Sequence, residues 1–261
     1  MIRNNRLRAA TLGFGLALLS TSLLAAPVVT VASDPTSGSS LSPDVATARG
    51  TFVGQLDQVQ GESFSGATDG TLADPQSLTI FDGQGTLTPS YSDFATYRVR
   101  SNPGTSGRFD TTCLTAQGAC SPRWFEAQGT FRVDFGGAFN AFGFYGTDIS
   151  DFYGKLQVEL IRSDGALTLL DELMFPESPL TGGLLFFGVL DEAASYTGAN
   201  IYITQTDEQG GIDYFGFDDL VLGQVARDPN PMPEPGSLAL VGASLLALTA
   251  ARRRRSGRHQ V

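Results

Sequence analysis

Alternation of apolar and polar residues, interrupted by glycine-rich turns, constrains the fold of this chain more than any other feature of its sequence. The alternation recurs at 130–135, 155–160 and 199–203. A period of two residues is typical of strands with one buried face. Glycine-containing pairs that favour turns occur at 136–137, 164–165, 182–183 and 210–211. No 12-residue amphipathic helical stretch competes with this pattern, so the sequence predicts an all-β fold, an antiparallel two-sheet sandwich of jelly-roll type.

The charge of the chain is unevenly distributed. Eight of the 17 basic residues lie in the first or last ten residues, and all 27 acidic residues fall between Asp34 and Glu234. The part between the two basic ends therefore carries nine basic and 27 acidic side chains, a net charge of −18. Such a polyanion repels nucleic acid and anionic lipid. The only histidine, His259, is in the basic tail, which excludes Ser-His-Asp, Cys-His and His-ligated zinc centres from the folded part.

The N-terminus has the three parts of an export signal. Three arginines in the first eight residues precede an apolar stretch from Ala9 to Leu24 and then small residues. We interpret residues 1–26 as a secretory signal peptide. Cleavage after Ala25 or as late as Ala32 satisfies the preference for small residues. A retained membrane helix is the weaker alternative, because the apolar stretch is short for a span.

The C-terminus has a second apolar segment in a different setting. A linker at 227–236 contains Pro233, Glu234 and Pro235, and the apolar segment 237–251 follows it. As a helix this segment rises about 24 Å, at about 1.5 Å per residue, and crosses a bilayer only with local thinning. Beyond it, the basic tail 252–261 contains four consecutive arginines: Arg252, Arg253, Arg254 and Arg255. Because such a cluster stays cytoplasmic, the segment is predicted to be a single transmembrane helix with the acidic domain outside.

This order of Pro-Glu-Pro motif, short apolar helix and arginine cluster resembles the PEP-CTERM sorting signal of exported bacterial proteins. The resemblance covers about 25 residues. It implies that an exosortase, an integral-membrane cysteine protease, removes the tail after a transient stay in the inner membrane. It also implies a Gram-negative producer of exopolysaccharide and a final location in the outer envelope or extracellular matrix.

A predicted domain lies between the two signals, at 44–226, after a Ser/Pro/Gly/Thr-rich linker at 33–43. Its segments 141–152, 185–189 and 214–220 look like a β-domain common among PEP-CTERM proteins. The resemblance extends upstream to about residue 105 through Gly107-Arg108-Phe109 and Trp124-Phe125-Glu126. Members of that group are mostly described as surface or matrix proteins. The closing segment 214–220 also resembles the last strand of carbohydrate-binding sandwiches, where an acidic residue often ligates a structural calcium.

Two adjacent aspartates in the closing segment suggest a metal site. Alternation places Asp219 on the face of Phe215 and Phe217, the expected core face, and Asp218 on the other. A buried carboxylate needs a cation or hydrogen bonds. Calcium could satisfy it, with a shell completed from a glycine-flanked loop. The four candidate ligands are Asp148, Asp151, Asp218 and Asp219. A turn carboxylate satisfied by backbone N–H groups is the alternative, since no calcium-loop motif is present.

The only two cysteines, Cys113 and Cys120, are predicted to form a disulfide, because export places them in an oxidising compartment. Two thiols without a histidine make a metal site improbable. We expect no other cofactor.

Three functions remain compatible with the sequence. The favoured one is a non-enzymatic surface or matrix protein whose sandwich contacts exopolysaccharide. A structural spacer or assembly subunit without a ligand comes second, and a glycosidase using two carboxylates third. Adjacent acids at 171–172, 191–192 and 207–208 are better explained as surface charge, because neighbours on a strand face opposite ways. Sugar clefts favour stacking aromatics, and Trp124 is the only tryptophan.

Overall fold

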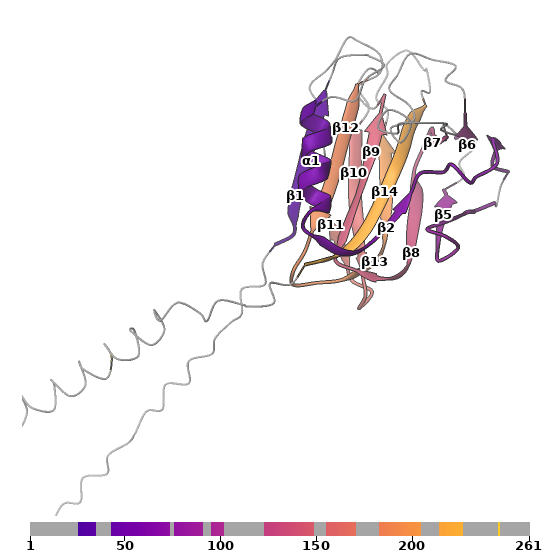
Figure 1. Ribbon diagram of the computed structural model, residues 1–261. Coiled ribbons are helices and arrows are strands. Elements are labelled where there is room, and N and C mark those ends of the chain that lie inside the picture. Colours follow the sequence, from indigo (N-terminus) through magenta and orange to yellow (C-terminus); the bar gives the residue numbers. More distant parts are fainter. Residues whose placement is uncertain are drawn as a thin grey trace, which may run out of the picture.

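The computed structural model describes residues 26–34, 43–73, 76–90, 95–101, 123–148, 155–170, 183–204, 214–226 and 245. They form a two-layer β-sandwich with one helix against the outside of one layer (Figure 1). The elements, in chain order, are β1 (Val28–Asp34), α1 (Pro43–Val53), β2 (Leu56–Glu62), β3 (Gly70–Thr71), β4 (Leu78–Ile80), β5 (Gly85–Pro89), β6 (Tyr97–Arg100), β7 (Trp124–Ala127), β8 (Phe131–Phe139), β9 (Ala141–Thr147), β10 (Lys155–Arg162), β11 (Leu167–Leu169), β12 (Leu184–Leu190), β13 (Tyr196–Thr204) and β14 (Phe215–Val225).

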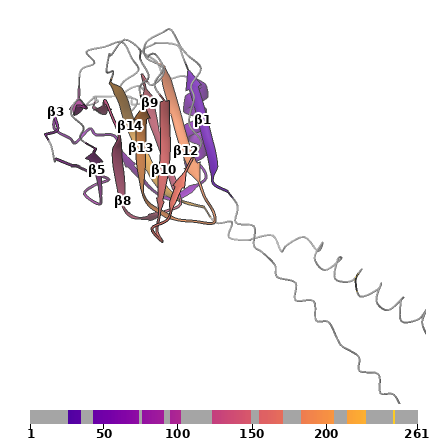
Figure 2. The same cartoon turned by 180° about the vertical axis from the view of Figure 1, so that it is seen from behind.

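Every strand pair in the two sheets is antiparallel. The eight-stranded sheet has the order β1-β12-β9-β14-β7-β6-β3, with β2 beside β14, and the six-stranded sheet has the order β11-β10-β13-β8-β5-β4. Figures 1 and 2 show the sandwich from its two sides. The predicted all-β fold of two antiparallel sheets is confirmed.

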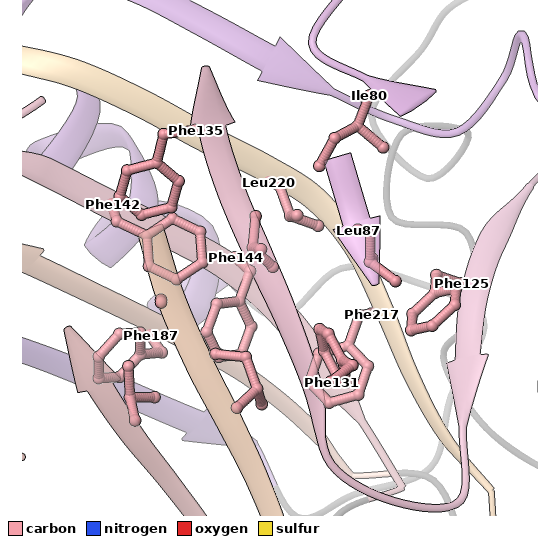
Figure 3. Close-up of a cluster of buried hydrophobic side chains, with 14 of the residues drawn as sticks. Ile80, Leu87, Phe125, Phe131, Phe135, Phe142, Phe144, Phe187, Phe217 and Leu220 are labelled. Carbon is pink, nitrogen blue, oxygen red and sulfur yellow. The ribbon is translucent and has the colours of Figure 1, made fainter. Parts of the chain in front are cut away.

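The main core lies between the sheets and is rich in phenylalanine (Figure 3). Phe131 of β8 and Phe217 of β14 meet edge to face, with ring centroids 4.8 Å apart. Phe135 and Phe142 lie 5.0 Å apart across the same interface. Aromatic pairs at these separations add stability beyond the apolar area that they bury. The predicted inward faces of 130–135 and 155–160 are confirmed, because their alternate apolar side chains are buried.

A second apolar cluster forms where α1 covers the outer face of β12 and β9. Phe52 of α1 packs directly over Gly188, where an added Cβ would lie 2.6 Å from the Phe52 ring. The helix was missed in the sequence because it is 11 residues long and buries only Val45 and Phe52 completely. Two buried positions do not make a periodic apolar face.

The folded part begins earlier than residue 44. β1 pairs with β12 along its whole length, so Ser33 and Asp34 belong to the sheet and not to a linker. Gly136 is also not at a turn. It lies inside β8 with φ of 71°, and an added Cβ would be 1.8 Å from the carbonyl oxygen of Gln84. The predicted turn at 164–165 is present, with Gly165 at φ of 84°.

Among the residues that the structure describes, no helix is long and apolar enough to cross a membrane. The predicted transmembrane segment 237–251 lies outside these residues except for Leu245.

Candidate functional site

Polar side chains gather on the outer face of the eight-stranded sheet, beyond the part that α1 covers. The register brings them into rows, because residues opposite each other on neighbouring strands share a face. One row runs through Arg98, Glu126, Gly216 and Thr147. The next pairs Arg100 with Trp124, and Asp218 with Tyr145. Strands β6, β7, β14 and β9 thus bring together residues that are far apart in the chain.

Glu126 is at the centre of the first row and is only 2% exposed. Its Oε1 accepts a hydrogen bond from the indole nitrogen of Trp124 at 2.9 Å, and its Oε2 accepts one from Nε of Arg98. The Arg98 guanidinium also lies over the ring of Tyr214, 3.6 Å from the ring centroid. A carboxylate on one side and an aromatic ring on another therefore fix the orientation of Arg98.

A hollow of about 260 Å³ opens beside this ordered guanidinium. Its lining residues come from β3, β6 and the residue before β3: Asp69, Gly70, Thr71, Arg98 and Arg100. The hydroxyl of Ser101 donates a hydrogen bond to Asp69. The residues that line the hollow thus include two arginines, one aspartate and one threonine, with Thr71 of β3 paired to Arg98 of β6. Arginine side chains donate several hydrogen bonds and an aspartate carboxylate accepts them, so these residues can contact a polar ligand.

The alternation predicted for β14 fails at the aspartates. The register of β14 against β9 shifts between Asp218 and Val221, and Asp219 has φ of 47°. A bulge of this kind inserts an extra residue and reverses the faces beyond it. Leu220 and Leu222 therefore join the core, whereas Asp219 is half-buried and Asp218, on the outer face, is 3% exposed. The prediction that Asp219 points into the core is wrong.

The predicted calcium ligands are only partly described. Asp148 is buried at the end of β9, three residues beyond Tyr145, the partner of Asp218. Three residues along a strand span about 10 Å. Within the described residues, no three His, Cys, Asp or Glu side chains are grouped to hold a metal. Asp151 lies outside these residues, so the four-aspartate site stays a prediction.

Asp218 has a hydrogen-bond donor close by in the chain. Its Oδ1 accepts the backbone N–H of Asp219 at 2.7 Å. This contact matches the alternative to calcium, a carboxylate held by backbone N–H groups.

Tyr145 joins these aspartates to α1. Burial raises the pKa of Tyr145 to about 12, the nearby guanidinium of Arg49 opposes this rise, and the charges of Asp219 and Asp218 add to it. The guanidinium carbon of Arg49 lies 5.5 Å from the centroid of the Tyr145 ring. Arg49 of α1 thus lies over Tyr145, the residue of β9 that pairs with Asp218.

The interpretation of the adjacent acidic residues as surface charge is wrong for Asp191. It is buried, and its Oδ1 accepts the N–H groups of Ala193 and Ala194 at 2.8 and 3.0 Å. The hydroxyl of Tyr196 donates to its other oxygen. Burial and this hydrogen bond raise the pKa of Tyr196. Asp191 therefore holds the turn before β13, whereas its neighbour Glu192 is exposed.

A second polar surface lies on the outer face of the six-stranded sheet. Nδ2 of Asn200 and the hydroxyl of Tyr202 both donate to Oε2 of Glu159 at 2.8 Å. The bond to Glu159 is the largest contribution that raises the pKa of Tyr202. Arg132 forms an exposed ion pair with Asp134 on the same face. The alternation at 199–203 already put Asn200 and Tyr202 opposite the core face, so this surface could have been found in the sequence.

The remaining predicted site residues lie outside the described part of the chain. They are Cys113, Cys120, Pro233, Glu234, Pro235, Arg252, Arg253, Arg254 and Arg255. The disulfide and the sorting motif therefore stay predictions. Trp124 is 1% exposed, so its ring is not available to stack on a sugar.

Comparison with known proteins gives no family. No family model and no curated protein matches the chain. Among solved structures, the K2 cleaved adhesin domain of Lys-gingipain is similar with 15% identity over 64% of this chain and 99% of that one, at a TM-score of 0.40. The xylan-binding domain from CBM 22 has 10% identity over 66% and 99%, at 0.34. A CBM29-2 mutant complexed with mannohexaose has 11% identity over 64% and 98%, at 0.28. Likeness at this level is common among unrelated β-sandwiches.

Proposed function

We propose that the chain is an exported, exosortase-processed surface or matrix protein whose sandwich is a non-catalytic module that binds exopolysaccharide. The observation that carries this proposal is the hollow beside Arg98, whose lining residues are Asp69, Gly70, Thr71, Arg98 and Arg100. Its volume, about 260 Å³, suits part of a polymer better than a large compact ligand, since drug-sized ligands occupy about 300 to 1,000 Å³.

The rigidity of this hollow supports binding to a polyol. Arg98 is fixed by Glu126 and by the ring of Tyr214, so little side-chain entropy is lost when a ligand binds. Vicinal hydroxyl groups donate to a carboxylate and accept from a guanidinium. The net charge of −18 between the basic ends favours a neutral glycan over a strongly anionic one.

The described carboxylates of the site support a non-catalytic role. A glycosidase needs two carboxyl groups that reach one glycosidic bond in a cleft. Glu126 and Asp218 are 2% and 3% exposed, and Glu126 has both oxygens engaged by Trp124 and Arg98. Asp69 is exposed, but it is the one acidic residue among the described residues that line the hollow, so a second carboxylate is missing there. A spacer or assembly subunit without a ligand remains the second candidate, and the carboxylate-based enzyme the third.

Sorting to the envelope rests on the two terminal signals. The signal peptide directs export, the segment 237–251 anchors the chain transiently in the inner membrane, and an exosortase removes the tail near Pro233-Glu234-Pro235. Mass spectrometry of protein from the native envelope is expected to find no peptide containing Arg252 to Arg255. Recovery of the intact basic tail from the outer surface contradicts this.

We also propose that the sandwich is of jelly-roll type, because the consecutive strands β8, β9 and β10 pass alternately between the two sheets.

The binding proposal is tested by titrating the mature protein with exopolysaccharide from the producing strain in a calorimeter. Arg100→Ala is expected to weaken binding about tenfold or more, because a hydrogen bond from a charged group contributes about 1.5 to 3 kcal/mol. Arg162→Ala, which removes the same charge at the 163–164 turn, is the control and is expected to bind like the wild type.

Two other outcomes are informative. Loss of binding in Tyr202→Ala but not in Arg100→Ala moves the site to the six-stranded sheet. Absence of binding to every polysaccharide tested contradicts the proposed function and favours the spacer.

A further inference from the structure

The two sheets end in strands of very different length. In the described residues, β3 has two residues, β4 has three and β11 has three. β1, at the end of the eight-stranded sheet, has seven. A strand at an edge leaves one row of backbone N–H and C=O groups available for pairing, and short edge strands limit that row. β2, also seven residues long, is a second long edge, because it pairs with β14 alone among the described strands. It contains Asp57 and Glu62, and its register with β14 shifts between Leu222 and Gln224. β1 is therefore the long edge without such features (Figure 2).

The sequence of β1 lacks the features that usually block an edge, and α1 packs against the strand on the side of Ala32. The first six residues of β1, 28–33, contain no charge and no proline, and it pairs with β12 without a bulge. Native sheets commonly protect such edges with lysine, proline or a bulge. Three of its valines are exposed instead: Val28 at 61%, Val29 at 40% and Val31 at 43%.

Exposed apolar residues are concentrated on this side of the molecule. β11 ends the six-stranded sheet on the side where β1 ends the other (Figure 1). Its Leu167 and Leu169 are more than half exposed. Of the seven large apolar residues exposed in the described ranges, five lie on β1 or β11. A cluster of exposed apolar residues along an open strand indicates an interaction surface.

We infer that β1 pairs antiparallel with β1 of a second copy of this chain, about a two-fold axis through Val31. The inference goes beyond glycan binding and rests on removal of the signal peptide. Cleavage near residue 26 leaves almost no chain before Val28 to cover the edge. In this register Val31 lies opposite Val31, Val29 opposite Ser33, and Asp34 opposite Val28.

A second copy of β1 fits this edge, because Asp34 is the only charged residue of the strand and lies opposite Val28 in the proposed register. The register places no two like charges opposite each other, and the backbone groups of both edges are satisfied at once. An isologous contact of this kind closes at a dimer and joins two sheets into one. The net charge of −18 between the basic ends of each chain opposes association, so salt is expected to strengthen it.

The first test is sedimentation of the exported, processed protein from about 1 µM to about 1 mM, the range in which a small interface is expected to associate. The wild type is expected to form a dimer that higher salt strengthens. Val31→Lys is expected to remain monomeric, because it places two ammonium groups opposite each other. Val59→Lys on β2 is the matched control, with the same change at a residue that is 47% exposed, and is expected to dimerise.

A monomer at every concentration overturns the inference, as does a dimer that Val31→Lys leaves intact. Thermal unfolding of both lysine variants checks that they are folded.

The second test reads the register. Val31→Cys places two thiols directly opposite each other, where Cβ atoms are about 4.5 to 5.5 Å apart, and is expected to form a disulfide-linked dimer on mild oxidation. Val59→Cys is the control and is expected to stay uncrosslinked. Equal cross-linking of the two variants overturns the proposed pairing. Neither test uses a glycan, so its failure is distinct from failure of the binding proposal.

Discussion

The indole N–H of Trp124 donates to the carboxylate of Glu126 two residues along the same strand, at 2.9 Å, in a site where both side chains are almost completely buried. The second oxygen of Glu126 is paired with Arg98 of β6. The one tryptophan of the chain therefore acts as a buried hydrogen-bond donor that helps to position an arginine. The orientation of the Arg98 guanidinium therefore depends on groups that solvent does not reach.

Glu126→Gln is expected to lower the free energy of unfolding by about 1 to 3 kcal/mol, because the substitution leaves a buried guanidinium contact without its charge partner. Urea denaturation measures this change. Asp134→Asn is the matched control, since Asp134 pairs with Arg132 on an exposed face. It is expected to cost less than about 1 kcal/mol. Equal losses in the two variants contradict a special role for the buried pair.

Alkaline pH is expected to destabilise the fold through Tyr145. Burial raises the pKa of Tyr145 from 10.0 to about 12, so the neutral phenol stabilises the folded state. This contribution is complete below pH 10 and is lost as pH rises through about 12. Tyr145→Phe is expected to lose less stability than the wild type over that interval, as measured by denaturation at fixed pH values. Identical pH dependence of the two proteins contradicts the assignment.

Gly188→Ala and Gly50→Ala are expected to change stability in opposite directions. At Gly188 an added Cβ meets the Phe52 ring at 2.6 Å, so α1 must shift, and such overpacking costs about 1 to 3 kcal/mol. At Gly50, inside α1, nothing lies within 4 Å, and alanine gains about 0.5 to 1 kcal/mol through helix propensity. Thermal melting compares the two. A stable Gly188→Ala variant is evidence against tight packing of α1 on β12.

Chelation tests the predicted calcium site. The predicted ligands are Asp148, Asp151, Asp218 and Asp219. An ion that binds only the folded state stabilises it by about 2.7 kcal/mol when its concentration is a hundredfold above Kd. A chelator is therefore expected to lower the melting temperature by several degrees if these residues hold calcium. Asp151→Ala is expected to remove this response, and Asp171→Ala is expected to keep it. An unchanged melting curve contradicts the calcium site and favours a carboxylate held by backbone N–H groups, such as that of Asp219.

The N-terminus of the mature protein is expected to lie before Val28. A cut after Ala32 would remove five of the seven residues of β1 and uncover the edge of β12, including buried Phe186 and Phe187. A cut near residue 26 leaves β1 complete. N-terminal sequencing of the exported protein decides between the two sites, and a chain that begins at Ser33 contradicts the prediction.

Part of the architecture was predictable because it depends on local periodicity. Phe131, Val133 and Phe135 alternate with polar residues, and a half-buried strand buries such a set whichever partner it pairs with. The terminal signals are also predictions that the sequence alone supports, because a processing enzyme recognises them as linear segments.

Features that depend on pairing between distant segments, such as the face on which a side chain lies and the position of an edge strand, were defined only by the tertiary structure. A single extra residue in β14 put Leu220 and Leu222 in the core and left Asp219 half-buried, and alternation along one strand cannot reveal such a bulge. Arg98, Glu126 and Tyr214 come from three segments that only the strand order brings together. The place of β1 at an open edge likewise follows from its register with β12, 150 or more residues along the chain. Long-range register is set by the packing of both sheets at once, so no single segment of the sequence encodes it.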